Sequence, residues 1–156
     1  MRIAGKEITQ ATEDVLVFPR GTSDPIVFKS KSIETFEPFT VMCPSPKVPK
    51  VLTPKGEKDD YEDVGYQQQM EAYAIKRLGW TVIKTLEPSE IEWDILDIEK
   101  PETYGKWEEE FREAGFTVGE INRILSFVVE TNSLSEAKLK QARADFLRTQ
   151  EAAQLT

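Results

Sequence analysis

The chain has 156 residues, of which 39% are hydrophobic and 31% charged, with a formal net charge of −8. This composition predicts one globular domain, or one domain with an appendage. The sequence has no histidine and one cysteine, Cys43. The absence of histidine excludes Ser-His-Asp and Cys-His catalysis and zinc sites that use histidine, and the single cysteine excludes a four-cysteine zinc site and an internal disulfide. Catalysis by carboxylates alone is compatible with this composition. We therefore expect no enzymatic activity, no metal or other cofactor, and a reducing cytoplasm.

The negative charge lies in the middle of the chain. Residues 1–58 hold nine Lys/Arg and seven Asp/Glu (+2), residues 59–115 hold six and sixteen (−10), and residues 116–156 hold five of each. This acidic belt repels nucleic-acid backbones and attracts a basic protein partner. No run approaches the ~20 apolar residues of a membrane helix, and the first residues lack a signal peptide's apolar region. We expect a protein partner, and neither nucleic acid nor membrane.

Residues 1–43 are expected to form a β region. Two segments rich in strand formers, 15–18 and 26–28, flank the turn residues 19–25 and predict an antiparallel hairpin with a long loop. A smaller hairpin is expected within residues 2–8.

Residues 44–58 are expected to be an extended loop or linker. Four prolines are interleaved there with four lysines, and proline serves neither a central strand nor a helix interior. A basic, mobile connector is favoured over a dedicated recognition motif.

Residues 59–150 are expected to be mainly helical, with one or two short strands. Asp59 and Glu62 can cap a helix whose apolar stripe ends at Gly79, a residue type common just past helix ends. The five residues after that glycine fit a strand.

Strict alternation over 90–95 favours a further strand, although Ser89 and Glu92 also fit a capping box for a short helix.

Three capped helices are expected after Pro101, which suits a first helical turn. The first ends at Gly115, and the second and third begin at the capping boxes 117–120 and 133–136. They should pack against one another, and residues 151–156 should fray. Their apolar stripes are Tyr104, Trp107, Phe111 and Ala114, then Ile121, Ile124, Leu125 and Val128, then Leu139, Ala142, Phe146 and Leu147. Together these elements predict an α+β fold, with an N-terminal hairpin region and a mainly helical C-terminal half.

Six carboxylates form a candidate acidic surface. A hard-cation site is one interpretation, but neither calcium-loop spacing nor a phosphate-binding glycine loop accompanies them, so a solvated surface is favoured. Cys43 is expected to be buried or incidental, because no histidine activates it. The three tryptophans are expected in the core or at subunit contacts, and not as a platform for bases. The acidic surface comprises Glu87, Glu90, Glu92, Asp94, Asp97 and Glu99.

Amphipathic helices in so small a protein serve either a partner, through helix-in-groove contacts or oligomerisation, or a self-contained subdomain. The sequence favours neither, and a homo-oligomer is one of the options. The last two helices are charge-balanced and have strong apolar stripes, which makes them the candidate contact region. The candidate partner-binding residues are Ile121, Ile124, Leu125, Val128, Leu139, Phe146 and Leu147.

Three segments resemble parts of small tailed-bacteriophage proteins: LEPSEIEW at 86–93, AGFTVGEINRI at 114–124, and NSLSEAKL with ARADFL within 132–147. A weaker similarity lies in FEPF at 36–39, followed by Cys43 and a proline. Together they resemble the phage tail assembly chaperones, over roughly residues 15–150. The resemblance implies a non-enzymatic protein of the host cell cytoplasm. Its implied role is to bind the tape measure protein and keep it soluble while tail tube subunits polymerise around it.

The sequence is also compatible with two alternative functions. The acidity of residues 59–115 fits an inhibitor or nucleic-acid mimic that binds a basic host protein. A minor structural protein of the virion neck or tail is the third option.

Overall fold

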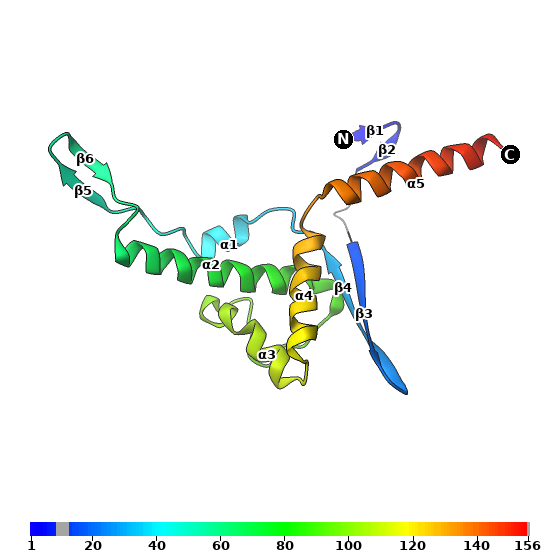
Figure 1. Cartoon of the computed structure of the whole chain (residues 1–156), viewed down its shortest axis with the longest axis horizontal. Coiled ribbons are helices and arrows are strands. Elements are labelled where there is room, and N and C mark those ends of the chain that lie inside the picture. Colours follow the sequence, from blue (N-terminus) through cyan, green and yellow to red (C-terminus); the bar gives the residue numbers. More distant parts are fainter. Residues whose placement is uncertain (9–12, 156) are drawn as a thin grey trace.

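The computed structural model describes residues 1–8 and 13–155. It has an α+β fold, with short antiparallel strand pairs in the N-terminal half and mostly helices in the C-terminal half (Figure 1). The strands are β1 (Arg2–Ile3), β2 (Lys6–Glu7), β3 (Glu13–Arg20), β4 (Ser23–Lys31), β5 (Lys50–Thr53) and β6 (Gly56–Asp59). The α-helices are α1 (Glu37–Met42), α2 (Val64–Thr85), α3 (Trp107–Glu113), α4 (Val118–Thr131) and α5 (Glu136–Gln154), and the 3₁₀-helices are η1 (Glu87–Ser89) and η2 (Pro101–Lys106).

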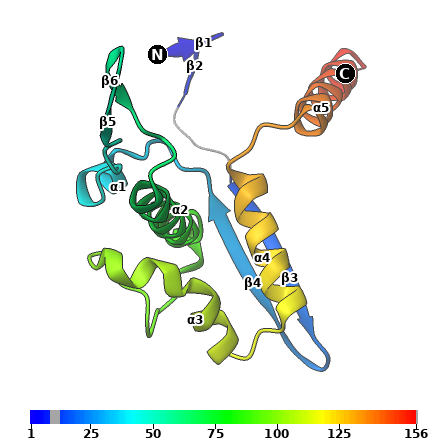
Figure 2. The same ribbon diagram turned by 60° about the vertical axis from the view of Figure 1, so that its left-hand side comes forward.

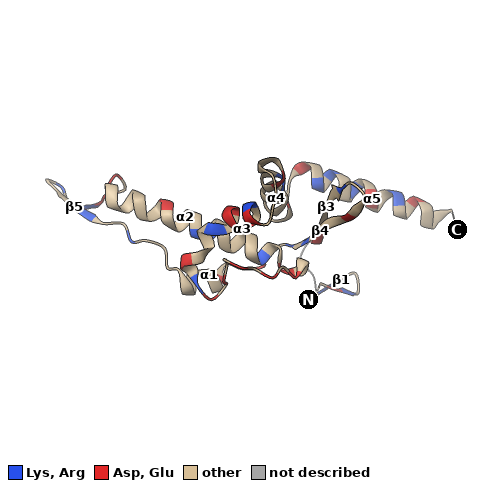
Figure 3. Cartoon of the chain, turned by 90° about the horizontal axis from the view of Figure 1, so that it is seen from below, with Lys and Arg blue, Asp and Glu red and all other residues tan. Residues whose placement is uncertain are grey.

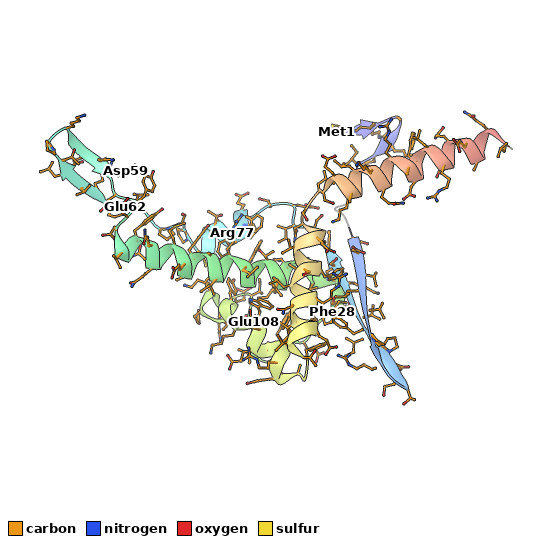
Figure 4. The ribbon with its side chains drawn as sticks, viewed as in Figure 1. Met1, Phe28, Asp59, Glu62, Arg77 and Glu108 are labelled. Atoms are coloured by element: carbon orange, nitrogen blue, oxygen red, sulfur yellow. The ribbon has the colours of Figure 1, made fainter. Side chains whose placement is uncertain are left out.

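The N-terminal hairpin and the helical half share one hydrophobic core. Helix α4 lies along the β3–β4 hairpin, and the C-terminal half of α2 and helix α3 lie beside them (Figure 2). Phe28 on β4 points to this junction (Figure 4). It forms an aromatic cluster with Phe18, Phe111 and Phe116, whose ring centroids lie 5.6–6.2 Å apart. These contacts join strand and helix across about 90 residues of sequence, so the two halves fold as one unit.

The predicted β3–β4 hairpin is confirmed, but its long loop is wrong. Arg20 pairs with Ser23, so the turn is only Gly21 and Thr22, and Pro19 and Pro25 lie inside the strands. Both strands of a two-stranded sheet are edge strands, so proline costs no ladder hydrogen bond where its nitrogen faces outward. The small hairpin near the N-terminus is also present, as β1–β2.

The segment expected to be a linker, 44–58, contains most of the β5–β6 hairpin. Thr53 pairs with Gly56, so the turn holds Pro54, and the other prolines precede β5. A hydrogen bond from Asp60 N–H to the Pro49 carbonyl (2.8 Å) closes the base. The prolines therefore lie before the first strand and in the turn, and none lies within β5 or β6. Helix α1 was also unexpected in the β region.

Helix α2 does not end at Gly79, and no strand follows. It begins after Asp63, whose side chain accepts the Tyr66 N–H (2.8 Å), and continues to Thr85. A β-carbon at Gly79 would lie 1.8 Å from the Tyr104 carbonyl oxygen. Gly79 therefore permits helix crossing, and the strand-forming residues after it stay helical because they pack in the core.

Residues 90–95 form neither of the expected elements. The backbone is irregular after η1, and Glu90 has φ 54°. The backbone N–H groups at the end of this segment donate to the side chain of Glu110, as described below.

The last three helices form, but only two of them pack. Gly115 (φ 98°) follows α3, and Thr117 and Glu120 complete the capping box of α4. Helix α5 is capped by Ser135 in place of Ser133 and extends through most of the tail that was expected to fray. It buries no side chain, so the expectation that all three helices pack together is wrong. Seven of its nineteen residues are charged, which makes it a poor core helix.

Three parts of the chain project from the core: α5, the β1–β2 hairpin, and the β5–β6 hairpin with the start of α2 (Figures 1 and 2). Helix α5 and the β5–β6 hairpin lie at opposite ends of the molecule. Among residues 1–8 and 13–155, no helix combines the length and apolarity needed to cross a membrane.

Candidate interaction surfaces

Helix α5 presents an apolar stripe to solvent. Leu139, Ala142 and Phe146 repeat at three- and four-residue spacing, which places them on one side of the helix. Leu139 is 44% exposed, Phe146 61% and Leu147, at the flank, 48%. The turned view shows α5 apart from the other described elements (Figure 2), and side chains of both charges occur along it (Figure 3). We call Leu139, Ala142, Phe146 and Leu147 the α5 stripe.

The predicted partner-binding residues on α4 lie in the chain's own core. Ile121, Ile124 and Val128 are at most 5% exposed, and Leu125 packs against the core from its edge. A core-facing stripe and a partner-facing stripe have the same helical period, so the sequence pattern alone did not separate α4 from α5. Of the predicted set, the residues on α5 are the accessible ones.

The base of α5 is fixed by polar contacts that sequence reasoning missed. The Asn132 amide donates to the Thr85 hydroxyl (2.8 Å) and the Val128 carbonyl (2.9 Å), and accepts the Ile33 N–H (2.9 Å). One step earlier, the buried Thr131 hydroxyl contacts the Ser30 hydroxyl (2.8 Å). These contacts tie α2, α4 and β4 together immediately before α5.

Of the six predicted acidic residues, Glu87 begins η1 and the other five lie in the segment between η1 and η2. Five of the six are exposed and Asp97 is half-buried. Glu87 lies 3.5 Å from the Lys84 ammonium, and Asp97 lies 3.9 Å from Lys100. In the part of the chain that the structure describes, no three His, Cys, Asp or Glu side chains are placed to hold a metal ion.

A seventh carboxylate, Glu110 on α3, binds the backbone of this segment. It is 9% exposed, and its two oxygens accept the N–H groups of Asp94 (2.8 Å), Ile95 (2.7 Å) and Leu96 (2.9 Å). These amides therefore need no strand ladder. Sequence reasoning missed Glu110, although its position beside Trp107 and Phe111 on the apolar side of α3 was a usable signal.

Hollows border the acidic segment on more than one side. One, of 590 Å³, lies between that segment and the end of α2. Another, of 410 Å³, lies beside β4, and we call it the β4 groove. Its lining combines the apolar residues Ile26, Val27, Phe28, Ile91, Trp93, Phe111, Ala114 and Phe116 with Ser89, Glu92, Asp94, Glu110 and Glu113.

The tryptophans divide between core and groove. Trp80 and Trp107 are buried in the core, as expected. Trp93 is half-buried, packs edge-on against Phe111 (5.6 Å between centroids) and lines the β4 groove.

Neither Cys43 nor Tyr104 is prepared for acid–base chemistry near neutral pH. Cys43 is buried as expected, and burial raises the pKa of its thiol above the ordinary value, with a smaller opposing effect from Lys76. Burial likewise raises the pKa of Tyr104 to about 12, and its hydroxyl donates to the Ile98 carbonyl. Both groups stay protonated in the core, where they act as packing residues.

In comparisons with known proteins, no protein-family model, no curated protein and no solved structure matches this chain.

Proposed function

We propose that this chain is a non-enzymatic tail assembly chaperone of a tailed bacteriophage, which binds the tape measure protein in the host cell cytoplasm. One observation carries the proposal: α5 is a complete helix of 19 residues with no buried side chain and with an exposed apolar stripe. A helix that buries none of its side chains among the described residues suits packing against a helix of another chain. The sequence resemblance supplies the phage context.

The α5 stripe suits reversible binding. Complete burial of one Leu or Phe side chain contributes about 1.5–3 kcal/mol, and these side chains are already partly covered. Much of that gain is offset by the cost of association. A complex that holds an aggregation-prone helix until tail tube subunits replace the chaperone needs such moderate affinity.

Coexpression with the phage's tape measure protein tests the proposal. The triple variant L139Q/F146Q/L147Q removes the stripe and keeps good helix formers. A matched control, K140Q/A144Q/E151Q, changes three exposed positions elsewhere on α5. Wild type and control should increase the soluble tape measure protein several-fold, and the stripe variant should not.

Two results would contradict the proposal. If the recovery of soluble tape measure protein is the same with and without the wild-type chain, the chain is not its chaperone. If the recovery with the stripe variant equals the recovery with wild type, α5 is not the binding surface. Detection of the chain at fixed copy number in purified virions would instead favour a structural tail or neck protein.

The acidic inhibitor is a second candidate, because Glu90, Glu92 and Asp94 are all exposed on one segment. It predicts a complex with a basic host protein that weakens steeply with salt. Charge reversal at the three positions should abolish that complex, and an unchanged complex would exclude this surface.

A further inference from the structure

Strand β4 has an open edge beside the β4 groove. The Ser89 hydroxyl accepts the Lys29 N–H (2.8 Å) and donates to the Lys29 carbonyl (2.7 Å). Both polar groups of Lys29 therefore point away from β3. Backbone groups alternate sides along a strand, and the β3–β4 register is regular here. The N–H and carbonyl of Val27 must then face the same outer edge.

Ser89 occupies this edge in the manner of a neighbouring strand, because one hydroxyl supplies both an acceptor and a donor. Its contacts close the edge at Lys29. At the other end the regular register stops at Ile26, and Pro25 has no N–H. The open length is therefore short: the N–H and carbonyl of Val27. No hydrogen bond to Val27 from outside the β3–β4 ladder occurs within residues 1–8 and 13–155.

The side chains around the open edge define what would bind there. Phe28, Trp93, Phe111 and Phe116 form an aromatic floor, and the groove lining contains four carboxylates but no lysine or arginine. Three of these carboxylates are exposed; the fourth, Glu110, is occupied by backbone amides.

One ring of this floor already packs against a cation outside the groove lining. The Arg20 guanidinium from β3 lies 5.5 Å from the centroid of Phe116, so that ring has a geometry that accepts a guanidinium.

We infer that the β4 edge and groove form a second binding site, for an extended segment of a protein partner that carries arginine or lysine next to apolar residues. The segment adds as a third strand at Val27 and places one basic side chain over the aromatic floor, among Glu92, Asp94 and Glu113. The backbone edge supplies affinity, and the carboxylate rim selects for positive charge. This site uses none of the α5 stripe and goes beyond the proposed function.

The test uses a blocked seven-residue peptide of alternating valine and arginine, added to the ¹⁵N-labelled full chain. The Val27 amide should shift and exchange more slowly with solvent. A peptide with glutamate in place of arginine, or with an N-methylated central valine, should not bind. The variant E92K/E113K should weaken binding about tenfold, whereas the matched control E57K/E71K should not. All four replaced side chains are exposed, so every variant should fold.

Three outcomes would overturn the inference. These are no change at the Val27 amide at ~1 mM peptide, equal weakening by both double variants, or shifts confined to α5. The variant L139Q/F146Q/L147Q should bind the peptide as wild type does, so loss of the α5 function and loss of this site are measured separately.

Discussion

The Glu110 carboxylate holds three consecutive backbone amides that no strand or helix satisfies. We expect Glu110→Ala to lower the free energy of unfolding by about 3 kcal/mol, because three partly or fully buried N–H groups lose their acceptor. Urea denaturation measures the change. The neighbouring, exposed Glu109→Ala should cost less than about 0.5 kcal/mol. Equal stability of the two variants would show that Glu110 does not hold the acidic segment.

We expect the contribution of Glu120 to stability to depend on pH. Its carboxylate accepts the Thr117 N–H (3.1 Å) and contacts Arg20 (2.6 Å), and these contacts, the backbone hydrogen bond first, lower its pKa below the usual 4.5. The unfolded state then binds the proton more readily than the folded state. Its contribution to stability is therefore present at neutral pH and is lost as the pH falls through the lowered pKa.

The measurable consequence is a pH-dependent difference between wild type and Glu120→Gln. In thermal melts, the melting temperature of wild type should exceed that of the variant at neutral pH. This difference in melting temperature should shrink once the pH falls below 4.5, the usual pKa of the carboxyl group. A difference that is constant with pH would assign the effect of the substitution to packing alone.

Residue roles of this kind were only partly predictable. The Thr117–Glu120 capping box is a local motif, with both partners three residues apart, and it was predicted. Glu110 and Asn132 have partners that only the tertiary fold brings near. Sequence alone showed an acidic residue within an acidic run and an asparagine in a turn.

At the scale of elements, Gly79 allows α2 to pass against the backbone of η2. We expect Gly79→Ala to destabilise the fold by about 3 kcal/mol, because the new β-carbon meets the Tyr104 carbonyl and backbone cannot easily shift. Gly119 in α4 is the matched control, since a β-carbon there has nothing within 4 Å. Gly119→Ala should stabilise by about 0.5–1 kcal/mol. Similar effects at both glycines would contradict the close approach at Gly79.

The same glycine explains the largest error in the predicted elements. Glycine marks helix ends when it takes a positive φ, as Gly115 does (98°), but it also marks close helix crossings, as at Gly79. Sequence pattern does not separate these two uses. The α+β class and the N-terminal hairpins were predictable, because strand-forming runs and capping boxes are local signals.

At the scale of the molecule, the core joins β3–β4 with α2, α3 and α4, and α5 lies outside it. The polar contacts of Asn132 complete the core before α5 begins. The fold therefore separates a stable body from an accessible helix, as a protein that presents a helix to a partner requires. The candidate surface on α5 was only partly predictable, because its stripe was visible in sequence but the exposure of its described side chains was not.

This separation predicts that a chain ending at Ser135 keeps its fold. Its free energy of unfolding should lie within about 0.5 kcal/mol of the full chain, because no buried side chain is removed. A chain ending at Ser126 loses the buried Phe127 and Val128 and should not fold. In the full chain, α5 amides should exchange with solvent much faster than α4 amides, since a helix of this length without tertiary contacts is marginal. A loss above about 2 kcal/mol on removal of α5, or slow exchange throughout α5, would mean that α5 packs within its own chain and is not free to bind a partner.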